Sequence, residues 1–309
     1  MTKMGSGRNT GRRAFLRNAA AIGGACGLPL AAPAQRCPTK PDTVRDRLWV
    51  FCNPTDADYN YVRQRSVMSP LENAVYLGAP NIIMVNQYSN GQHGCYQPWT
   101  PPFEQYTVAL QVQKRVAWSI VGAAGVTHES ERTQVIEMAR HTPNVVGIYM
   151  DDFFEKKAAV ASLTLDQLQA IHREIKSGPK PLDLYVTLYT HDLVKPIREY
   201  LELIDVVTLW TWETADLANL DANVAKVQKS APKSRILLGC FTADYDAERT
   251  PWWAPLPVAT MQHQCEFAVR CLRERRIEGF VIYGNFFDLG WDCVKWARQW
   301  VGQVGDTEI

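Results

Sequence analysis

Two adjacent aspartates near the middle of the chain are the clearest candidates for acid–base chemistry. They lie in Tyr149–Phe154 (YMDDFF), where Asp151 and Asp152 stand between bulky apolar side chains. A carboxyl group that is partly removed from water has a raised pKa and suits a general acid, while a better solvated neighbour stays ionised. The segment therefore predicts a catalytic carboxyl pair. The alternative is that both aspartates cap the next helix or bind an arginine.

The alternation of side chains along a strand indicates which aspartate faces the site, because successive strand residues point to opposite faces. Polar and aromatic residues share one parity in three later apolar runs. If this parity is the inward one, Tyr149 and Asp151 face inward, and Asp152 becomes a supporting partner or a loop ligand. The residues of that parity are Tyr185, Thr187 and Tyr189, then Thr208, Trp210 and Trp212, then Val281, Tyr283 and Asn285.

Glu213 is the candidate for a second carboxylate across the site, because it ends another apolar run, just after Trp210-Thr211-Trp212. Asp151 or Asp152 would then protonate a leaving oxygen, and Glu213 would act as the nucleophile or as the base for water. A separation of about 5 Å between the carboxyl groups predicts retention, and about 6.5–9.5 Å predicts inversion. The alternative for Glu213 is a surface ion pair.

Tryptophans give the second indication of function, since the chain has ten of them. Indole faces pack against the apolar C–H faces of sugars, and the ring N–H can bind a hydroxyl group. We expect Trp99, Trp210, Trp212, Trp252, Trp253 and Trp291 over the site and Trp49, Trp118, Trp296 and Trp300 in the core. The predicted substrate-binding residues are Asp56, Asn86, Tyr149, Tyr189, Trp210, Trp212, Asp244, Tyr283 and Asn285.

The elements that must position these residues alternate between short apolar runs and stretches of helical periodicity, eight times between Arg47 and the C-terminus. This alternation predicts a single (β/α)8 TIM barrel, of class α/β, with the active site at the C-terminal ends of its strands. In one of the helical stretches, Leu163–Lys176, Thr164 and Gln167 predict a capping box. The expected strands are 47–53, 81–88, 115–121, 144–152, 182–191, 205–213, 235–244 and 278–288.

The first 34 residues are interpreted as an export signal. Gly11–Arg17 (GRRAFLR) resembles the twin-arginine signature, a mildly apolar stretch follows, and Ala32-Pro33-Ala34 is typical of a cleavage site. The resemblance implies a bacterial protein that the twin-arginine machinery exports folded, to the periplasm or beyond, with residues 35–309 as the barrel domain. The alternatives are a basic disordered tail or a lipid anchor at Cys26.

Composition narrows the partners and cofactors. Removing residues 1–34 takes away five of the 33 Lys and Arg and none of the 32 Asp and Glu, so the remainder is mildly acidic, which argues against nucleic acid as a partner. No nucleotide-binding glycine motif follows the first strand, and no cysteine or histidine cluster has zinc-site spacing. We therefore expect no cofactor and no metal. Cys52 and Cys240 lie inside apolar runs and are expected to be buried free thiols.

The expected barrel, its acidic fourth strand and its Trp-rich sixth strand together resemble the TIM-barrel glycoside hydrolase group. The nearest motif is the chitinase-like D-x-x-D-x-D-x-E run that ends the fourth strand. The corresponding run here is Gly147–Glu155 (GIYMDDFFE), which keeps a glycine and aspartates but not the alternating spacing. The resemblance implies a carbohydrate substrate and cleavage of a glycosidic bond.

Two other classes of function remain open at this point. A metal-dependent barrel hydrolase would need clustered imidazoles, whereas only His191 lies at a predicted strand end. A non-catalytic glycan-binding barrel would keep the aromatic cleft without a competent acid–base pair, and the same fold can host either outcome.

Overall fold

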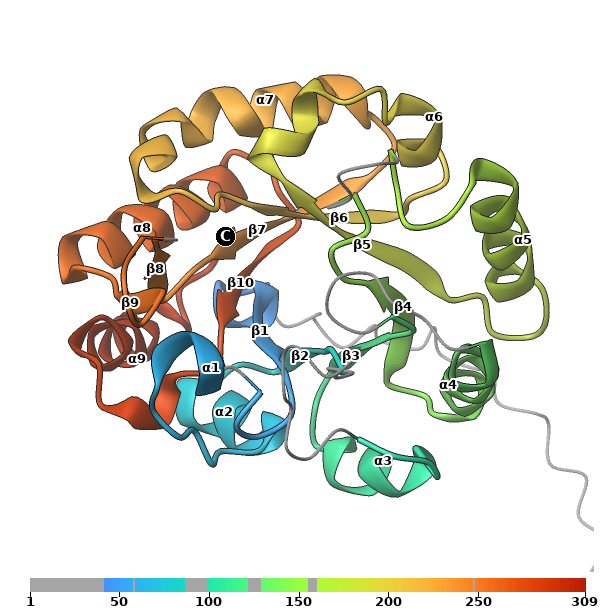
Figure 1. The fold of residues 1–309 in the computed structure, drawn as a ribbon, viewed down its shortest axis with the longest axis horizontal. Helices are drawn as coiled ribbons and strands as arrows, with labels where there is room; N and C mark the ends of the chain where they lie inside the picture. Colours follow the sequence, from blue (N-terminus) through green and yellow to red (C-terminus); the bar gives the residue numbers. More distant parts are fainter. Residues whose placement is uncertain (1–41, 58, 87–98, 122–128, 155–159, 247) are drawn as a thin grey trace, which may run out of the picture. The chain divides into compact units, whose positions relative to one another are not determined.

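The computed structural model describes residues 42–57, 59–86, 99–121, 129–154, 160–246 and 248–309. Within them, eight parallel strands close into a barrel in the order β1-β10-β7-β6-β5-β4-β3-β2 (Figure 1). This confirms the predicted single (β/α)8 barrel. The strands are β1 (Leu48–Cys52), β2 (Asn81–Met84), β3 (Arg115–Ser119), β4 (Val145–Met150), β5 (Asp183–Tyr189), β6 (Val206–Trp210), β7 (Arg235–Cys240) and β10 (Gly279–Tyr283).

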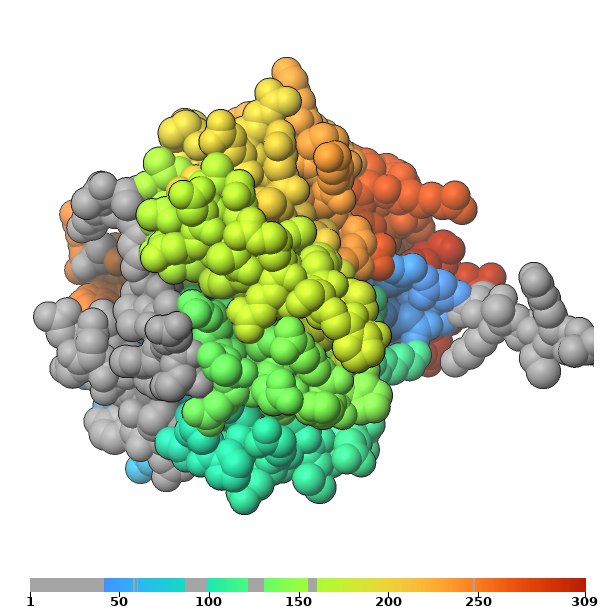
Figure 2. All heavy atoms as spheres, turned by 90° about the vertical axis from the view of Figure 1, so that its right-hand side faces the viewer, coloured from blue at the N-terminus to red at the C-terminus, as the bar shows by residue number. Residues whose placement is uncertain are grey.

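Helices follow the strands and surround the barrel (Figure 1). In Figure 2, which turns the side of α4 and α5 toward the viewer, the green and yellow-green side chains close this side of the barrel. The helices are α1 (Tyr59–Val62), α2 (Pro70–Leu77), α3 (Glu104–Leu110), α4 (Glu129–His141), α5 (Leu165–Lys176), α6 (Arg198–Leu201), α7 (Leu220–Ser230), α8 (Val258–Arg273) and α9 (Asp292–Val304). Short 3-10 turns are η1 (Arg45–Arg47), η3 (Thr190–Val194), η4 (Thr214–Asn219) and η5 (Phe287–Leu289).

Helix α5 shows how local sequence sets these elements. Thr164 caps it, and the Thr164 and Gln167 side chains each accept a hydrogen bond from the other's backbone N–H, so the predicted capping box is confirmed. Leu168, Ile171 and Ile175 form its buried stripe. A helix with one apolar stripe is stable only when that stripe packs on the barrel.

The barrel interior is filled by large aromatic side chains. The Phe51 ring lies 6.0 Å from Tyr149, 5.6 Å from Trp210 and 5.3 Å from Tyr283, so residues of four different strands meet across the barrel. One layer below, Trp49 packs 5.9 Å from Tyr185. These contacts confirm that the polar and aromatic parity is the inward one.

A two-stranded hairpin, β8 (Ala243–Tyr245) and β9 (Trp253–Pro255), follows β7 and pairs antiparallel. Arg249 holds it together, because its guanidinium donates to the backbone oxygens of Asp244 and Trp252 and pairs with the Asp244 carboxylate at 3.2 Å. The hairpin thereby fixes Trp253 relative to the end of β7.

Cysteines in the described part of the chain are free and buried: Cys52, Cys240, Cys265, Cys271 and Cys293. This confirms the prediction for Cys52 and Cys240. Cys26, Cys37 and Cys95 lie outside the described residues, as does the segment 1–34 that was interpreted as an export signal. None of the helices from residue 42 onward that the structure describes has the length and apolar character needed to span a membrane.

Candidate active site at the mouth of the barrel

A cleft of about 100 Å³ lies at the C-terminal ends of the strands, where the sequence predicted the site. Its lining comes from six barrel strands or the residues directly after them, and from α1 and β9. Six of the predicted site residues take part: Asp151, Asp152, Tyr189, Trp210, Trp212 and Tyr283. The other lining residues are Phe51, Asn53, Tyr61, Thr187, Phe241 and Trp253.

Asp151 is the first residue after β4 and reaches the cleft from the inward parity of that strand. Its side chain is almost completely buried, with 7% of the residue exposed. The Thr187 hydroxyl on β5 donates to Asp151 Oδ1 at 2.8 Å. The carboxyl group is therefore fixed in the wall of the cleft by a neighbouring strand.

Asp152 also reaches the cleft, which simple strand alternation does not predict. Its φ of 49° is left-handed, a conformation that a non-glycine residue adopts only when its surroundings hold it there. The chain turns at this residue, and its side chain lines the same cleft as that of Asp151. The Tyr189 hydroxyl then donates to Asp152 Oδ1 at 2.7 Å. Asp152 is thus a cleft residue as well as a partner of β5.

Two tyrosines beside the aspartates stay protonated. Burial, followed by the charge of Asp151, raises the pKa of Tyr149. Burial, followed by the charges of Asp152 and Asp151, raises the pKa of Tyr189 well above its ordinary value. Both phenols are therefore neutral hydrogen-bond donors across the working range of most enzymes.

Aromatic rings make up most of the remaining lining, and Trp212 packs against several of them. The Trp212 ring lies 5.3 Å from Tyr189, 5.8 Å from Phe241 and 5.7 Å from Trp253, in edge-to-face geometry. Tyr61 of α1 packs 5.9 Å from Trp253. Edge-to-face packing holds each ring rigidly, so the wall presents preformed flat surfaces to a ligand.

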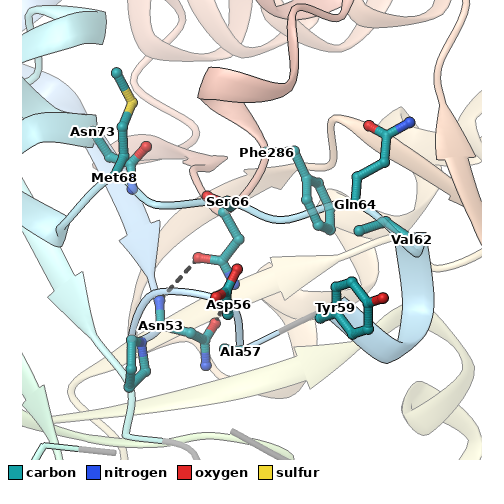
Figure 3. A pocket seen from close by; sticks show the side chains of 12 residues that line it. Asn53, Asp56, Ala57, Tyr59, Val62, Gln64, Ser66, Met68, Asn73 and Phe286 are labelled. Carbon is teal, nitrogen blue, oxygen red and sulfur yellow. Dashed lines mark hydrogen bonds between the residues drawn. The ribbon is translucent and has the colours of Figure 1, made fainter. Parts of the chain in front are cut away.

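Four of the predicted binding residues lie outside the described lining of the cleft. Tyr149 is fully buried inside the barrel, and Asp244 holds the β8–β9 hairpin. Asn285 accepts from the Asn53 backbone at 2.9 Å, and its amide donates to the Tyr283 hydroxyl at 3.1 Å. Asp56 lies in a neighbouring pocket of about 10 Å³, shown in Figure 3, where it pairs with Arg65 at 2.5 Å.

Glu213 and Asn86 lie elsewhere on the barrel. Glu213 directly precedes η4, is exposed, and does not belong to the described lining of the cleft, because Trp212 takes the inward position beside it. Asn86 exchanges hydrogen bonds with the Trp99 backbone and donates to Glu131. Glu213 is therefore not among the described lining residues of the cleft, and its catalytic role remains a prediction.

The tryptophans divide differently from the prediction. Trp210, Trp212 and Trp253 line the cleft, whereas Trp99 packs 5.7 Å from Trp118 and Trp291 packs 4.8 Å from Phe286, each with 7% exposed. Trp99 and Trp291 precede helices, and their rings pack inward beside those helices, so the prediction that they cover the site is wrong. Trp49, Trp118 and Trp300 are buried and Trp296 packs against the core, as predicted.

Tyr61, Phe241 and Glu131 were not singled out from the sequence. Phe241 shares the inward parity of Gly239 on β7, which was a usable signal. Tyr61 belongs to a four-residue helix that no periodicity announces. Over the described ranges, the structure shows no group of three His, Cys, Asp or Glu side chains that could hold a metal ion.

Glu131 is a buried carboxyl group, 6% exposed, that accepts a hydrogen bond from Asn86 at 3.2 Å. Burial raises its pKa from 4.5 to about 7. The folded state therefore binds more protons than the unfolded state between these values, and stability falls as the pH rises through 7. We expect Glu131→Gln to be more stable than the unchanged protein by about 1–3 kcal/mol at pH 8, with little difference at pH 5. Urea unfolding at both pH values measures this, and equal differences at both would contradict it.

Comparison with known proteins shows what the fold resembles. No protein-family model matches the chain, and no curated protein matches it in sequence. A proposed α-L-fucosidase from Bacteroides thetaiotaomicron superposes with a TM-score of 0.55 at 11% identity, over 87% of this chain and 96% of that one. A chitinase from Cycas revoluta in complex with allosamidin gives 0.52 at 12% identity, over 82% and 98%.

A third similar structure is a xylanase–α-amylase inhibitor protein in complex with trehalose, with a TM-score of 0.50 at 11% identity, over 83% of this chain and 98% of that one. At such identities the likeness establishes the fold alone. Glycoside hydrolases are thus among the structural neighbours of this barrel, beside a protein that is named as an inhibitor.

Proposed function

We propose that the protein is a glycoside hydrolase that cleaves an O-glycosidic bond in the cleft at the barrel mouth. The observation that carries this proposal is that two carboxyl groups, Asp151 and Asp152, reach one cleft whose remaining lining is largely aromatic. Carboxyl groups supply the proton and the negative charge that glycosidic cleavage needs, and indole faces bind sugar rings. The carbohydrate-active neighbours of the fold agree with this assignment but do not carry it.

Asp151 is the general acid in this proposal. Burial in the cleft wall favours the protonated form of a carboxyl group. Its proton passes to the glycosidic oxygen as the bond from that oxygen to the anomeric carbon breaks. The resulting Asp151 carboxylate then takes a proton from the water that attacks the anomeric carbon, so the residue ends as it began.

Asp152 is the ionised partner. It is less buried than Asp151, and the Tyr189 hydroxyl donates to it at 2.7 Å, which favours a carboxylate. A negative charge at this place stabilises the positive charge that develops on the sugar ring as the bond breaks. Trp212 and Trp253 hold the ring, and Tyr283 belongs to the same lining.

The test is to incubate the purified protein with a panel of polysaccharides and oligosaccharides and to measure new reducing ends together with binding. The proposal predicts that at least one glycan binds and is cleaved. Binding without new reducing ends for every glycan that binds would reject the hydrolase and favour a glycan-binding barrel. That second candidate has one observation in its favour, because the acidic side chains in the described lining come from a single strand end.

We also propose that the chain is exported through the twin-arginine route, on the strength of Arg12-Arg13 and the segment that follows. Expressed from its first residue in a bacterium, the protein is expected in the periplasm, shortened at its N-terminus. Replacing both Arg12 and Arg13 by Lys is expected to keep most of it in the cytoplasm at full length. Cell fractionation with mass measurement checks this, and equal export of the two forms would reject the signal.

A further inference from the structure

A chain of hydrogen bonds runs from β6 through the barrel interior to Asp151. The Trp210 ring N–H donates to the Thr208 hydroxyl at 3.0 Å, and Tyr149 contacts the same hydroxyl at 2.8 Å. The Tyr149 hydroxyl also lies 2.6 Å from that of Thr187, which donates to Asp151. Three hydroxyl groups on three neighbouring strands thus connect an indole to a carboxyl group.

The chain has a second end at a backbone carbonyl. The Thr208 hydroxyl is placed to donate to the Val186 oxygen at 3.1 Å as well as to Tyr149. An indole N–H can only donate, so Trp210 supplies a hydrogen to Thr208 in every arrangement. The direction of the remaining links depends on where the Thr208 hydrogen points.

When Asp151 is ionised, it can only accept. Thr187 then donates to Asp151, Tyr149 donates to Thr187, and Thr208 donates to Tyr149. Each hydroxyl has one hydrogen and each is used, so every hydrogen bond points toward the charge. Aligned hydrogen bonds in a medium of low dielectric constant strengthen one another.

When Asp151 carries a proton on Oδ1, every link can reverse. The carboxyl O–H donates to Thr187, Thr187 to Tyr149, Tyr149 to Thr208, and Thr208 to the Val186 oxygen. Only O–H bonds rotate, and no proton moves along the chain. All donors keep an acceptor in this arrangement as well.

We propose that Thr187, Tyr149 and Thr208 form a reversible hydrogen-bond relay that satisfies Asp151 in both its protonated and its ionised form. These three are positioning residues, because they act on a substrate through Asp151. Tyr149 and Thr208 are buried inside the barrel, and Thr187 also lines the cleft. The inference rests on the proposed function for its catalytic meaning: a residue that serves first as acid and then as base needs support in both states.

Burial makes the relay necessary. Tyr149 and Thr208 are 0% exposed and Thr187 is 1% exposed, so water has no access to replace a missing partner. A buried donor or acceptor without a partner destabilises the state that contains it. Burial also raises the pKa of Tyr149, so its phenol keeps its proton and can only reorient.

The test compares the pH midpoint of the Asp151 carboxyl group in the unchanged protein and in Tyr149→Phe. The midpoint is read by carbon NMR of aspartate-labelled protein without substrate, and Asp151→Asn identifies the signal. Phenylalanine removes the acceptor that Thr187 needs when Asp151 is protonated, which leaves a buried hydroxyl hydrogen without a partner. In the ionised form it removes only the donor behind Thr187, which is a smaller loss, and the Thr187 donor to the carboxylate stays. The relay therefore predicts a midpoint lowered by about 0.5–1 unit. An unchanged or raised midpoint would overturn the relay. If the hydrogen bonds always pointed toward Asp151, Tyr149→Phe would only weaken support for the carboxylate, and the midpoint would not fall.

Two further variants sharpen the result. Thr187→Val removes the donor to the carboxylate and is expected to raise the midpoint, and Thr187→Ser to restore it. The control is Tyr185→Phe. It removes the hydroxyl of a buried tyrosine on β5 that is 3% exposed and does not belong to the relay, and it is expected to leave the midpoint unchanged. If Tyr149→Phe does not fold, Thr208→Val replaces it, with a smaller shift in the same direction.

Other ionisable groups near Asp151 can also affect its pH midpoint. Asp152 follows it on the same strand end, Tyr189 faces it from β5, and Tyr61 and Tyr283 line the same cleft. Asp152 is a second carboxyl group in the same cleft, so the variants are also measured with Asp152→Asn, where the sign of the shift is expected to persist. Because no glycan is present, a protein that fails to cleave glycans would refute the proposed function while the NMR midpoints still decide the relay.

Discussion

Replacing Asp151 by Asn is expected to lower kcat for glycan cleavage by about 10²–10⁴-fold, the contribution that a positioned general acid makes. Asparagine keeps the shape of the side chain and can still accept from Thr187, but it has no proton to give to the leaving oxygen. The thermal midpoint should therefore change little. Release of reducing ends under saturating substrate, together with a melting curve, measures both quantities.

The matched control is Glu213→Gln, which also replaces a carboxyl group by an amide. Glu213 is exposed and lies outside the described lining of the cleft, so turnover should stay within about twofold. The single variant Asp152→Asn, in contrast, should lose activity as Asp151→Asn does. If Glu213→Gln lost as much activity as Asp151→Asn, the acid–base pair across the cleft would be right, and the assignment to the two aspartates would be wrong.

Gly239→Ala is expected to have the largest effect on stability and on the cleft together. A Cβ at Gly239 of β7 would lie 2.2–2.3 Å from ring atoms of Trp210, which is packed against Phe241 at 4.8 Å and held by Thr208. The indole has no room to yield, and overpacking of this kind costs about 1–3 kcal/mol. We expect a thermal midpoint lowered by about 2–4 °C for each kcal/mol, and weaker glycan binding as Trp210 is displaced.

Gly302→Ala is the control for this substitution. Gly302 lies in α9, and nothing lies within 4 Å of a Cβ built there, so alanine should leave the thermal midpoint unchanged or raise it slightly. Melting curves and glycan titrations of both variants decide the matter. A Gly239→Ala protein that keeps both its melting temperature and its affinity would show that Trp210 is not confined as the barrel packing indicates.

The barrel could be predicted because its strands are buried on both faces and read as continuous apolar runs. The expected run 278–288 contains β10, Gly279–Tyr283, but overshoots its end, since Asn285 turns away to support Tyr283 and Asn53. The same happens at 205–213, where β6 ends at Trp210 and the chain enters η4. Polar residues after a strand mark the edge of the sheet but do not show how far the strand continues.

The inward parity could also be predicted, and with it the places of Asp151, Tyr189 and Trp210. The left-handed backbone at Asp152 could not, because it depends on contacts with another strand and not on the local sequence. The burial of Glu131 likewise depends on Asn86, far away in the chain. Sequence patterns assign faces within one strand, whereas the partners of each carboxyl group come from the closure of the barrel.

The most direct test of the account is to let the protein act on a bound oligosaccharide in water enriched in the heavy oxygen isotope and to weigh the products. Hydrolysis by the Asp151 mechanism predicts shorter products with one heavy oxygen at each new reducing end, and no such products from Asp151→Asn. Recovery of the intact oligosaccharide after prolonged binding to the unchanged protein would contradict the proposed activity.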